Sequence, residues 1–195
     1  MKYTKIPSTT FQKLVLNAGV IAKDFDTTTG SLVDTDILGA TTGGCTFAAT
    51  PEFVDFGEDI DNCQKNMMEL KNLDNWDVSL SGTLLTADTS VIEFLIGAAD
   101  TSGNKVTPRR TVHLSDFDDL WLIADYSDVH DDEGQTTKAG YIAIKILNAL
   151  NTGGFQLVTQ DKGKGQFAFT FTGHVSMSAQ DTVPFEVYIV PGVTP

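Results

Sequence analysis

The chain has 195 residues, 41% hydrophobic and 20% charged, which is ordinary for a globular protein and favours a single domain over residues 1–195. Its net charge of −13 argues against a general nucleic-acid binder, because such a protein needs a basic face to neutralise phosphates. No apolar run approaches the roughly 18 residues of a membrane helix. Residues 1–10 lack the apolar core of a secretory signal. We therefore expect synthesis in the cytosol, no membrane segment, and free thiols at Cys45 and Cys63.

The negative charge is concentrated in one part of the chain. Residues 115–137 contain eight acids and no lysine or arginine. One interpretation is a solvated surface that keeps the protein soluble. The other is a surface that repels another polyanion.

The N-terminal third of the sequence predicts one strand and one long loop. Residues 11–21 alternate, with Leu14, Leu16, Ala18 and Val20 on one face, as in a half-buried strand. Residues 24–44 are rich in Thr, Gly and Asp around a small apolar centre. Loops of this length inside a compact domain are usually functional or disordered, so we interpret 24–44 as a long inter-strand loop.

Residues 76–84 give the clearest strand pattern. Apolar side chains occupy one face: Trp76, Val78, Leu80 and Leu84. Polar side chains occupy the other: Asp77, Ser79, Ser81 and Thr83. A strand with this alternation places one side against a core and the other side away from it.

One helix is expected after this strand. Thr86 or Asp88 can cap it, and a stripe of Val91, Ile92, Leu95 and Ala99 would form its buried face. The remaining segments predict short strands: 45–54, 109–114, 120–126, 155–160, 166–173 and 185–189; residues 141–150 fit a strand or a helix. The expected class is mainly β, a β-sandwich or split barrel with one short α-helix packed beside it.

The sequence contains no recognisable catalytic signature. It has no GxSxG elbow, no phosphate-binding glycine loop and no GxGxxG after a strand. His130 lies among Asp128, Asp131 and Asp132, which is either a solvated hairpin tip or a divalent-metal site; the spacing does not match an EF-hand, so we favour the hairpin tip. His113 and His174 are expected to be structural, and the Arg109–Arg110 pair to meet acidic neighbours. We therefore predict no catalytic residue, no metal, no cofactor and no enzymatic activity.

The order of several segments carries a resemblance to a known family. These are GGCTFAATPEFVDFGEDIDN (43–62), WDVSLSGTLLTADTSVIEFLIGAAD (76–100), FAFTFTGH (167–174) and PFEVYIV (184–190). In this order the chain resembles the major tail tube protein of phages with long, non-contractile tails and of related prophages.

The resemblance implies a subunit of the virion tail. Hexameric rings would stack into a hollow tube through the 24–44 loop, which makes candidate contact residues of Asp24, Asp26, Asp34, Asp36, Ile37 and Leu38. A tape measure protein would fill the channel before DNA passes through it, and tail terminator and distal tail proteins would close the ends. The alternatives are a tube protein of a contractile tail or secretion-type system, a monomeric β-sandwich binding module, and a small hydrolase.

A conduit for DNA must not bind DNA, so an acidic or neutral channel wall is expected. The polar face Asp77, Ser79, Ser81 and Thr83 has short side chains, one acid and no cation. We therefore expect this face to line the channel, with the outer tube surface as the alternative.

Overall fold

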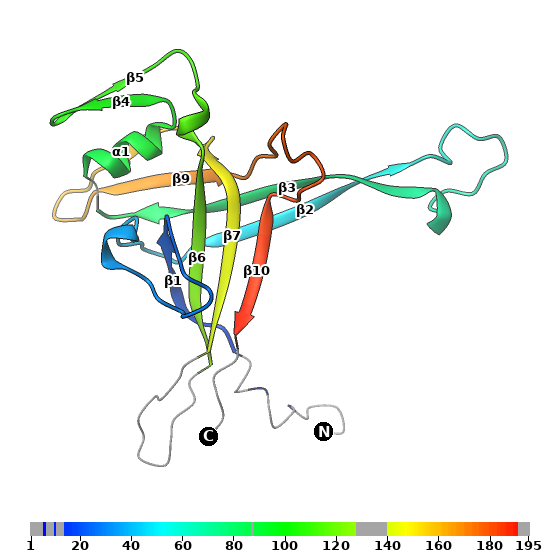
Figure 1. The fold of residues 1–195 in the computed structure, drawn as a ribbon, viewed down its shortest axis with the longest axis horizontal. Helices are drawn as coiled ribbons and strands as arrows, with labels where there is room; N and C mark the ends of the chain where they lie inside the picture. Colours follow the sequence, from blue (N-terminus) through cyan, green and yellow to red (C-terminus); the bar gives the residue numbers. More distant parts are fainter. Residues whose placement is uncertain (1–5, 7–9, 11–13, 87, 128–139, 191–195) are drawn as a thin grey trace.

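The computed structural model describes residues 6, 10, 14–86, 88–127 and 140–190 (Figure 1). Its strands are β1 (Leu16–Ala22), β2 (Thr46–Asp55), β3 (Lys71–Leu84), β4 (Ala99–Ser102), β5 (Lys105–Pro108), β6 (Asp118–Ser127), β7 (Gly140–Asn151), β8 (Gln156–Val158), β9 (Gln166–Thr172) and β10 (Phe185–Val190). The α-helix is α1 (Thr89–Ile96), and the 3-10 turns are η2 (Asp34–Asp36), η3 (Met68–Leu70) and η4 (Leu114–Asp116). The predicted class, mainly β with one short helix, is confirmed.

The main sheet has two halves, both antiparallel. Strands β1, β6, β7 and β10 form one half, and strands β8, β9, β3 and β2 form the other. They join where Leu150 and Asn151 of β7 pair with Thr172 and Phe171 of β9. Figure 1 shows the two sets of strands crossing, so their inner faces can pack on one another as in a β-sandwich. The described strands do not close into a barrel.

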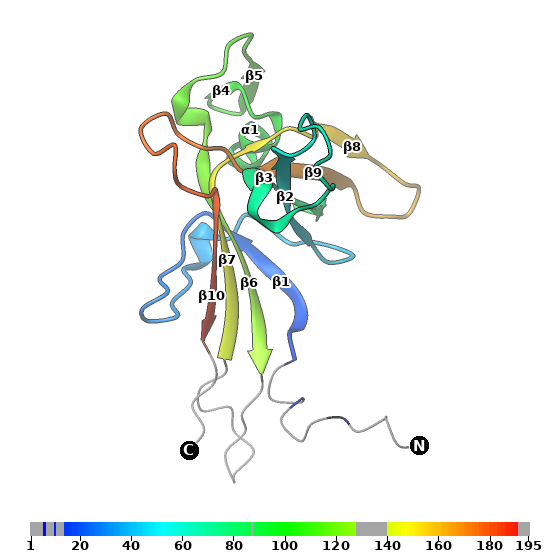
Figure 2. The same cartoon turned by 90° about the vertical axis from the view of Figure 1, so that its right-hand side faces the viewer.

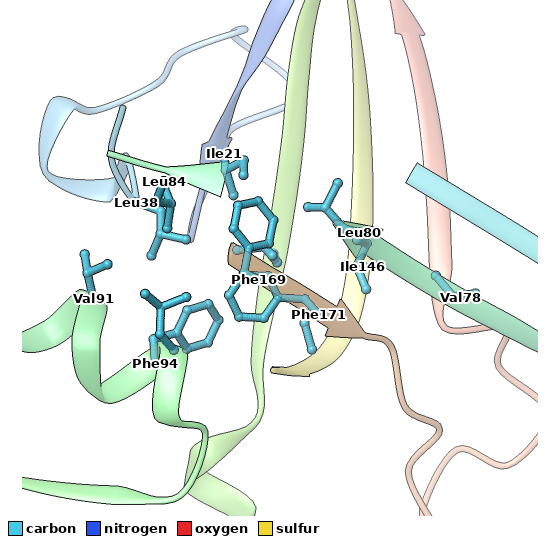
Figure 3. Packing of buried hydrophobic residues seen from close by; sticks show 13 residues of the cluster. Ile21, Leu38, Val78, Leu80, Leu84, Val91, Phe94, Ile146, Phe169 and Phe171 are labelled. Carbon is cyan, nitrogen blue, oxygen red and sulfur yellow. The ribbon is translucent and has the colours of Figure 1, made fainter. Parts of the chain in front are cut away.

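The core lies where the two halves cross, packed against α1 (Figure 3). Its fully buried side chains come from β1, β3, α1, β6, β7 and β9: Ile21, Val78, Leu80, Leu84, Leu95, Leu120, Ile146, Ala149 and Phe171. Phe94 of α1 stacks on Phe171 with ring centroids 4.6 Å apart. Helix and both half-sheets therefore share one hydrophobic cluster.

Helix α1 begins and ends with clear local signals. The Asp88 carboxylate accepts a hydrogen bond of 2.8 Å from the Val91 N–H, as an N-cap does. Gly97 ends the helix with φ of 83°, a conformation that glycine adopts without strain. Ala99, expected on the helical stripe, is instead buried at the start of β4, because the chain has already turned at Gly97.

Two other sequence-based predictions were wrong. In β1 the predicted apolar face is interrupted by positive φ at Asn17 and Gly19, which shifts the register with β6. As a result Ile21 and Ala22 are buried, whereas Val20 is 36% exposed. Residues 109–114 form no strand; the β4–β5 hairpin precedes them, and the Arg109 side chain is held by Asp100 and Asp116.

One buried polar side chain connects the helix to the sheet. Asn151 is 6% exposed and donates hydrogen bonds to the carbonyl oxygens of Leu95 and Gly154. Its Oδ1 accepts hydrogen bonds from Thr170 N at 3.0 Å and Gly153 N at 3.3 Å. A buried amide with every partner in place fixes how the end of α1 sits against β7 and β9.

We predict that Asn151→Ala lowers the free energy of unfolding by about 2–3 kcal/mol, because it leaves buried backbone groups without partners. Asn72→Ala is the matched control, at an asparagine exposed on β3 whose side chain makes no hydrogen bond in the described part of the chain, and it should change stability by less than about 0.5 kcal/mol. Urea unfolding followed by tryptophan fluorescence measures both. Equal effects of the two substitutions would contradict the role given to Asn151.

Candidate assembly surfaces

A face of small polar side chains covers the second half of the sheet. Strand β3 lies between β2 and β9, and directly opposed residues share a face of the sheet. Ser79 lies opposite Ala48 and Thr172, and Ser81 lies opposite Thr46 and Thr170. We call the following set the polar face: Thr46, Ala48, Thr50, Asp77, Ser79, Ser81, Thr83, Ala168, Thr170 and Thr172. It contains one acid and no lysine or arginine.

The alternation predicted for β3 is present in the structure. Val78, Leu80 and Leu84 are fully buried, and the polar residues between them are exposed or half-buried. The same pleat is carried into β2 and β9, where Phe47 and Phe171 pair with Leu80 on the core side. The four predicted polar residues therefore lie together on one open surface.

The loop over residues 24–44 is anchored to the body at its base. Backbone hydrogen bonds run from Lys23 N to Asp36 O (2.8 Å), from Leu38 N to Ile21 O (2.8 Å) and from Leu85 N to Ala40 O (2.7 Å). Leu38 is 4% exposed and belongs to the main core. Its burial removes Leu38 from the predicted contact residues, because a side chain inside the subunit cannot also contact a neighbour.

The other predicted contact residues in this loop are at the surface or half-buried. Asp24, Asp26 and Asp34 are exposed, and Asp36 and Ile37 are half-buried. The Asp26 carboxylate accepts hydrogen bonds from the Thr29 hydroxyl (2.6 Å) and the Thr28 N–H (2.8 Å), and these bonds lower its pKa. On its inner side the loop buries Phe25, whose ring lies edge-on to Trp121 and Tyr141.

The β2–β3 hairpin continues well beyond the body, as Figure 1 shows on the right. We call residues 53–73 the arm. Its exposed large apolar residues are Phe53, Val54, Phe56, Ile60, Met67, Met68 and Leu73. Its tip is braced by the Asp55 carboxylate, which accepts hydrogen bonds from Gly57 N (2.9 Å) and Asn66 N (3.0 Å), so the pKa of Asp55 is lowered. A lone two-stranded hairpin is marginally stable in water, and an apolar surface of this kind usually has a partner.

The sequence did not reveal the arm. The sequence predicts shorter strands, over 45–54 and 76–84, than the observed β2 (Thr46–Asp55) and β3 (Lys71–Leu84). The reason is physical: the arm has no core beside it, so its residues need not alternate. The sequence does contain one signal of the arm: residues 53–73 combine many apolar side chains with acids but show no strand-like or helix-like alternation.

Each half of the sheet has two edge strands within the part of the chain that the structure describes. Strands β2 and β8 are the edges of the half with the polar face, and strands β1 and β10 are the edges of the other half (Figure 2). Val187 and Ile189 of β10 are 46% and 54% exposed. Unpaired edges present free N–H and C=O groups that can pair with another chain.

In the ranges that the structure describes, the titratable side chains form hydrogen bonds and ion pairs of a structural kind. Among the described residues, no group of three or more His, Cys, Asp or Glu side chains could hold a metal ion. Residues 128–134, with His130, lie outside the described residues. His174 Nδ1 lies 3.1 Å from Asn148 O, and its ring packs edge-on against Phe117. Burial raises the pKa of the Cys45 thiol. Arg109 meets acidic neighbours as predicted, in Asp100 and Asp116.

No helix in the described part of the chain is both long and apolar enough to cross a membrane. No protein-family model matches the chain, and no curated protein sequence matches it. Among solved structures, it is similar to a chain of the virion of a native gene transfer agent particle, with 10% sequence identity, 82% of this chain and 92% of that chain covered, and a TM-score of 0.40.

We predict that Leu38→Ala destabilises the subunit by about 2–4 kcal/mol, because it removes a buried side chain and leaves a cavity. Val33→Ala, at a position 55% exposed in the same loop, should change stability by less than about 0.5 kcal/mol. Thermal unfolding of both variants distinguishes them. A neutral Leu38→Ala would show that the base of the loop is not part of the core.

Proposed function

We propose that this protein is a structural subunit without catalytic activity, which assembles with copies of itself into hexameric rings that stack into a hollow phage tail tube. One observation carries the proposal: the half-sheet β8-β9-β3-β2 has its apolar face in the core, its polar face open, and both of its edges unpaired within the described residues. A sheet of this kind is a segment of a barrel wall that several copies can complete.

The edge strands are the sites where neighbouring copies would pair. If β2 of one copy lies beside β8 of the next, the contact is head-to-tail, and a head-to-tail contact that closes gives a ring. A closed ring of sheets leaves no free edge, which removes the risk of uncontrolled aggregation. Stacking of rings then extends the tube, and we assign this contact to the exposed part of the 24–44 loop, including Asp24, Asp26 and Asp34.

The polar face would then line the channel. Short Ser, Thr and Ala side chains make a smooth wall, and the absence of cations prevents the phosphate contacts that would hold DNA. In this arrangement a tape measure protein occupies the channel before ejection, DNA passes without specific binding, and tail terminator and distal tail proteins cap the ends. The subunit is made in the host cytoplasm and functions in the virion tail.

In another arrangement, β10 of one copy pairs with β1 of the next, and the polar face lies on the outer surface of the tube. The exposed Val187 and Ile189 on β10 favour a contact there. A tube of a contractile tail or secretion-type system, or a monomeric binding module, would use the same fold differently. Only the monomeric module is incompatible with self-assembly.

We expect the purified protein to form rings or tubes at high concentration, because its apolar edge and arm residues are uncovered in the single subunit. Mass photometry over a concentration series, followed by negative-stain microscopy, measures this. A protein that stays monomeric at every concentration and salt tested would contradict the proposal and favour the binding module.

We also expect Ser79→Lys with Ser81→Lys to leave tubes intact but to make their channel retain DNA at low salt, because added cations on the wall neutralise phosphates. Ser115→Lys with Ser178→Lys is the control, at exposed positions away from the polar face. DNA ejection by particles carrying each variant, and salt-dependent DNA retention by purified tubes, are the measurements. If both pairs behave alike, the polar face is not the channel wall.

A further inference from the structure

The long axis of the molecule ends in two surfaces of different chemistry. At one end is the arm, and at the other is the turn between β8 and β9 (Figure 1, right and left). Because they lie on opposite sides of the body, they cannot meet within one molecule. Two copies placed head-to-tail could bring them together.

The arm is apolar and acidic. Residues 53–73 contain five acids and two lysines, a net charge of −3. Asp55 is already engaged in the turn of the arm. Glu58, Asp59 and Asp61 are exposed, beside the exposed side chains of Phe56 and Ile60. A surface that matches the arm must therefore be apolar with a positive rim.

The β8–β9 end has this complementary character. Residues 152–166 contain two lysines and one acid, a net charge of +1 in a chain whose total is −13. Lys162 and Lys164 are exposed, and neither has a carboxylate oxygen within 4.0 Å in the described part of the chain. Beside them Phe155, Leu157 and Val158 are 46%, 50% and 40% exposed.

We propose that the arm of one copy docks on the β8–β9 end of the next copy, with its acids facing Lys162 and Lys164 and its apolar residues covering Phe155 and Leu157. The inference rests on the proposed self-assembly and names the surfaces that direct it. The contact joins copies end to end along the long axis, so it is separate from the side-by-side pairing of β2 and β8 proposed within a ring, and it adds to the ring–ring contact assigned to the 24–44 loop.

The charges give the contact its direction. Copies carrying a charge of −13 repel one another, so they approach best where opposite signs meet. An arm placed on another arm would bring acids together, and like charges placed opposite one another cost several kcal/mol. Arm-to-arm dimers are therefore disfavoured, and the head-to-tail contact remains.

Charge reversal at each end tests the contact. The arm-reversed variant carries Glu58→Lys, Asp59→Lys and Asp61→Lys, which changes the arm from −3 to +3. The turn-reversed variant carries Lys162→Glu and Lys164→Glu, which changes residues 152–166 from +1 to −3. Each variant alone places like charges at the contact, so we expect the concentration needed for assembly, measured by mass photometry, to rise by more than about tenfold.

Mixing the two variants is the decisive measurement. In the mixture every positive arm can meet a negative turn, and every negative arm can meet a positive turn, so assembly should return in mixed particles. The matched control compares two single substitutions of the same charge change, Arg110→Glu and Lys164→Glu. Arg110 is exposed between β5 and η4, away from both ends of the molecule. Thermal unfolding of each variant establishes that the subunit remains folded.

The outcomes separate this contact from self-assembly itself. A wild-type protein that never assembles overturns the proposed function. A wild-type protein that assembles, with reversed variants that assemble at the same concentration, overturns the arm contact and leaves self-assembly standing. Variants that fail alone and also fail when mixed overturn the contact as well, because opposite charges would then be present without effect.

Discussion

The alternation of β3 is the constraint on which the rest of the structure depends. Burying Val78, Leu80 and Leu84 joins the second half-sheet to the first, at roughly 1.5–3 kcal/mol for each large side chain. The pleat then forces Ser79, Ser81 and Thr83 to the opposite side. Because β3 is central, its register carries the same division into β2 and β9. One strand thus fixes both the core and an open polar surface.

The same division explains why assembly is a reasonable role for this fold. In a subunit with one buried sheet face, one polar face and free edges, the unpaired backbone N–H and C=O groups lie along the edge strands. Its −13 charge keeps single copies apart, whereas its uncovered apolar residues favour contact. Opposed tendencies of this kind permit assembly only in the orientations where opposite charges meet.

Much of the fold could be predicted from the sequence, because the alternation of apolar and polar residues reflects which side chains are buried. The strand over 76–84 and the mainly β class follow from residues that face a core, and the cap at Asp88 follows from the side-chain oxygen that an N-cap needs. The register of β1 could not be predicted, since positive φ at Asn17 and Gly19 breaks an apparently regular alternation. The burial of Leu38 was missed because a loop residue reaches the core only through contacts distant in sequence. The arm was missed because it has no core to impose a period.

A cryo-electron microscopy reconstruction of the assembled protein tests the central claim most directly. The account predicts rings around an open channel, with Ser79 and Ser81 facing the channel and β2 of each copy beside β8 of the next. A reconstruction with both serines on the outer surface, or with the β2 and β8 edges left free, would contradict it.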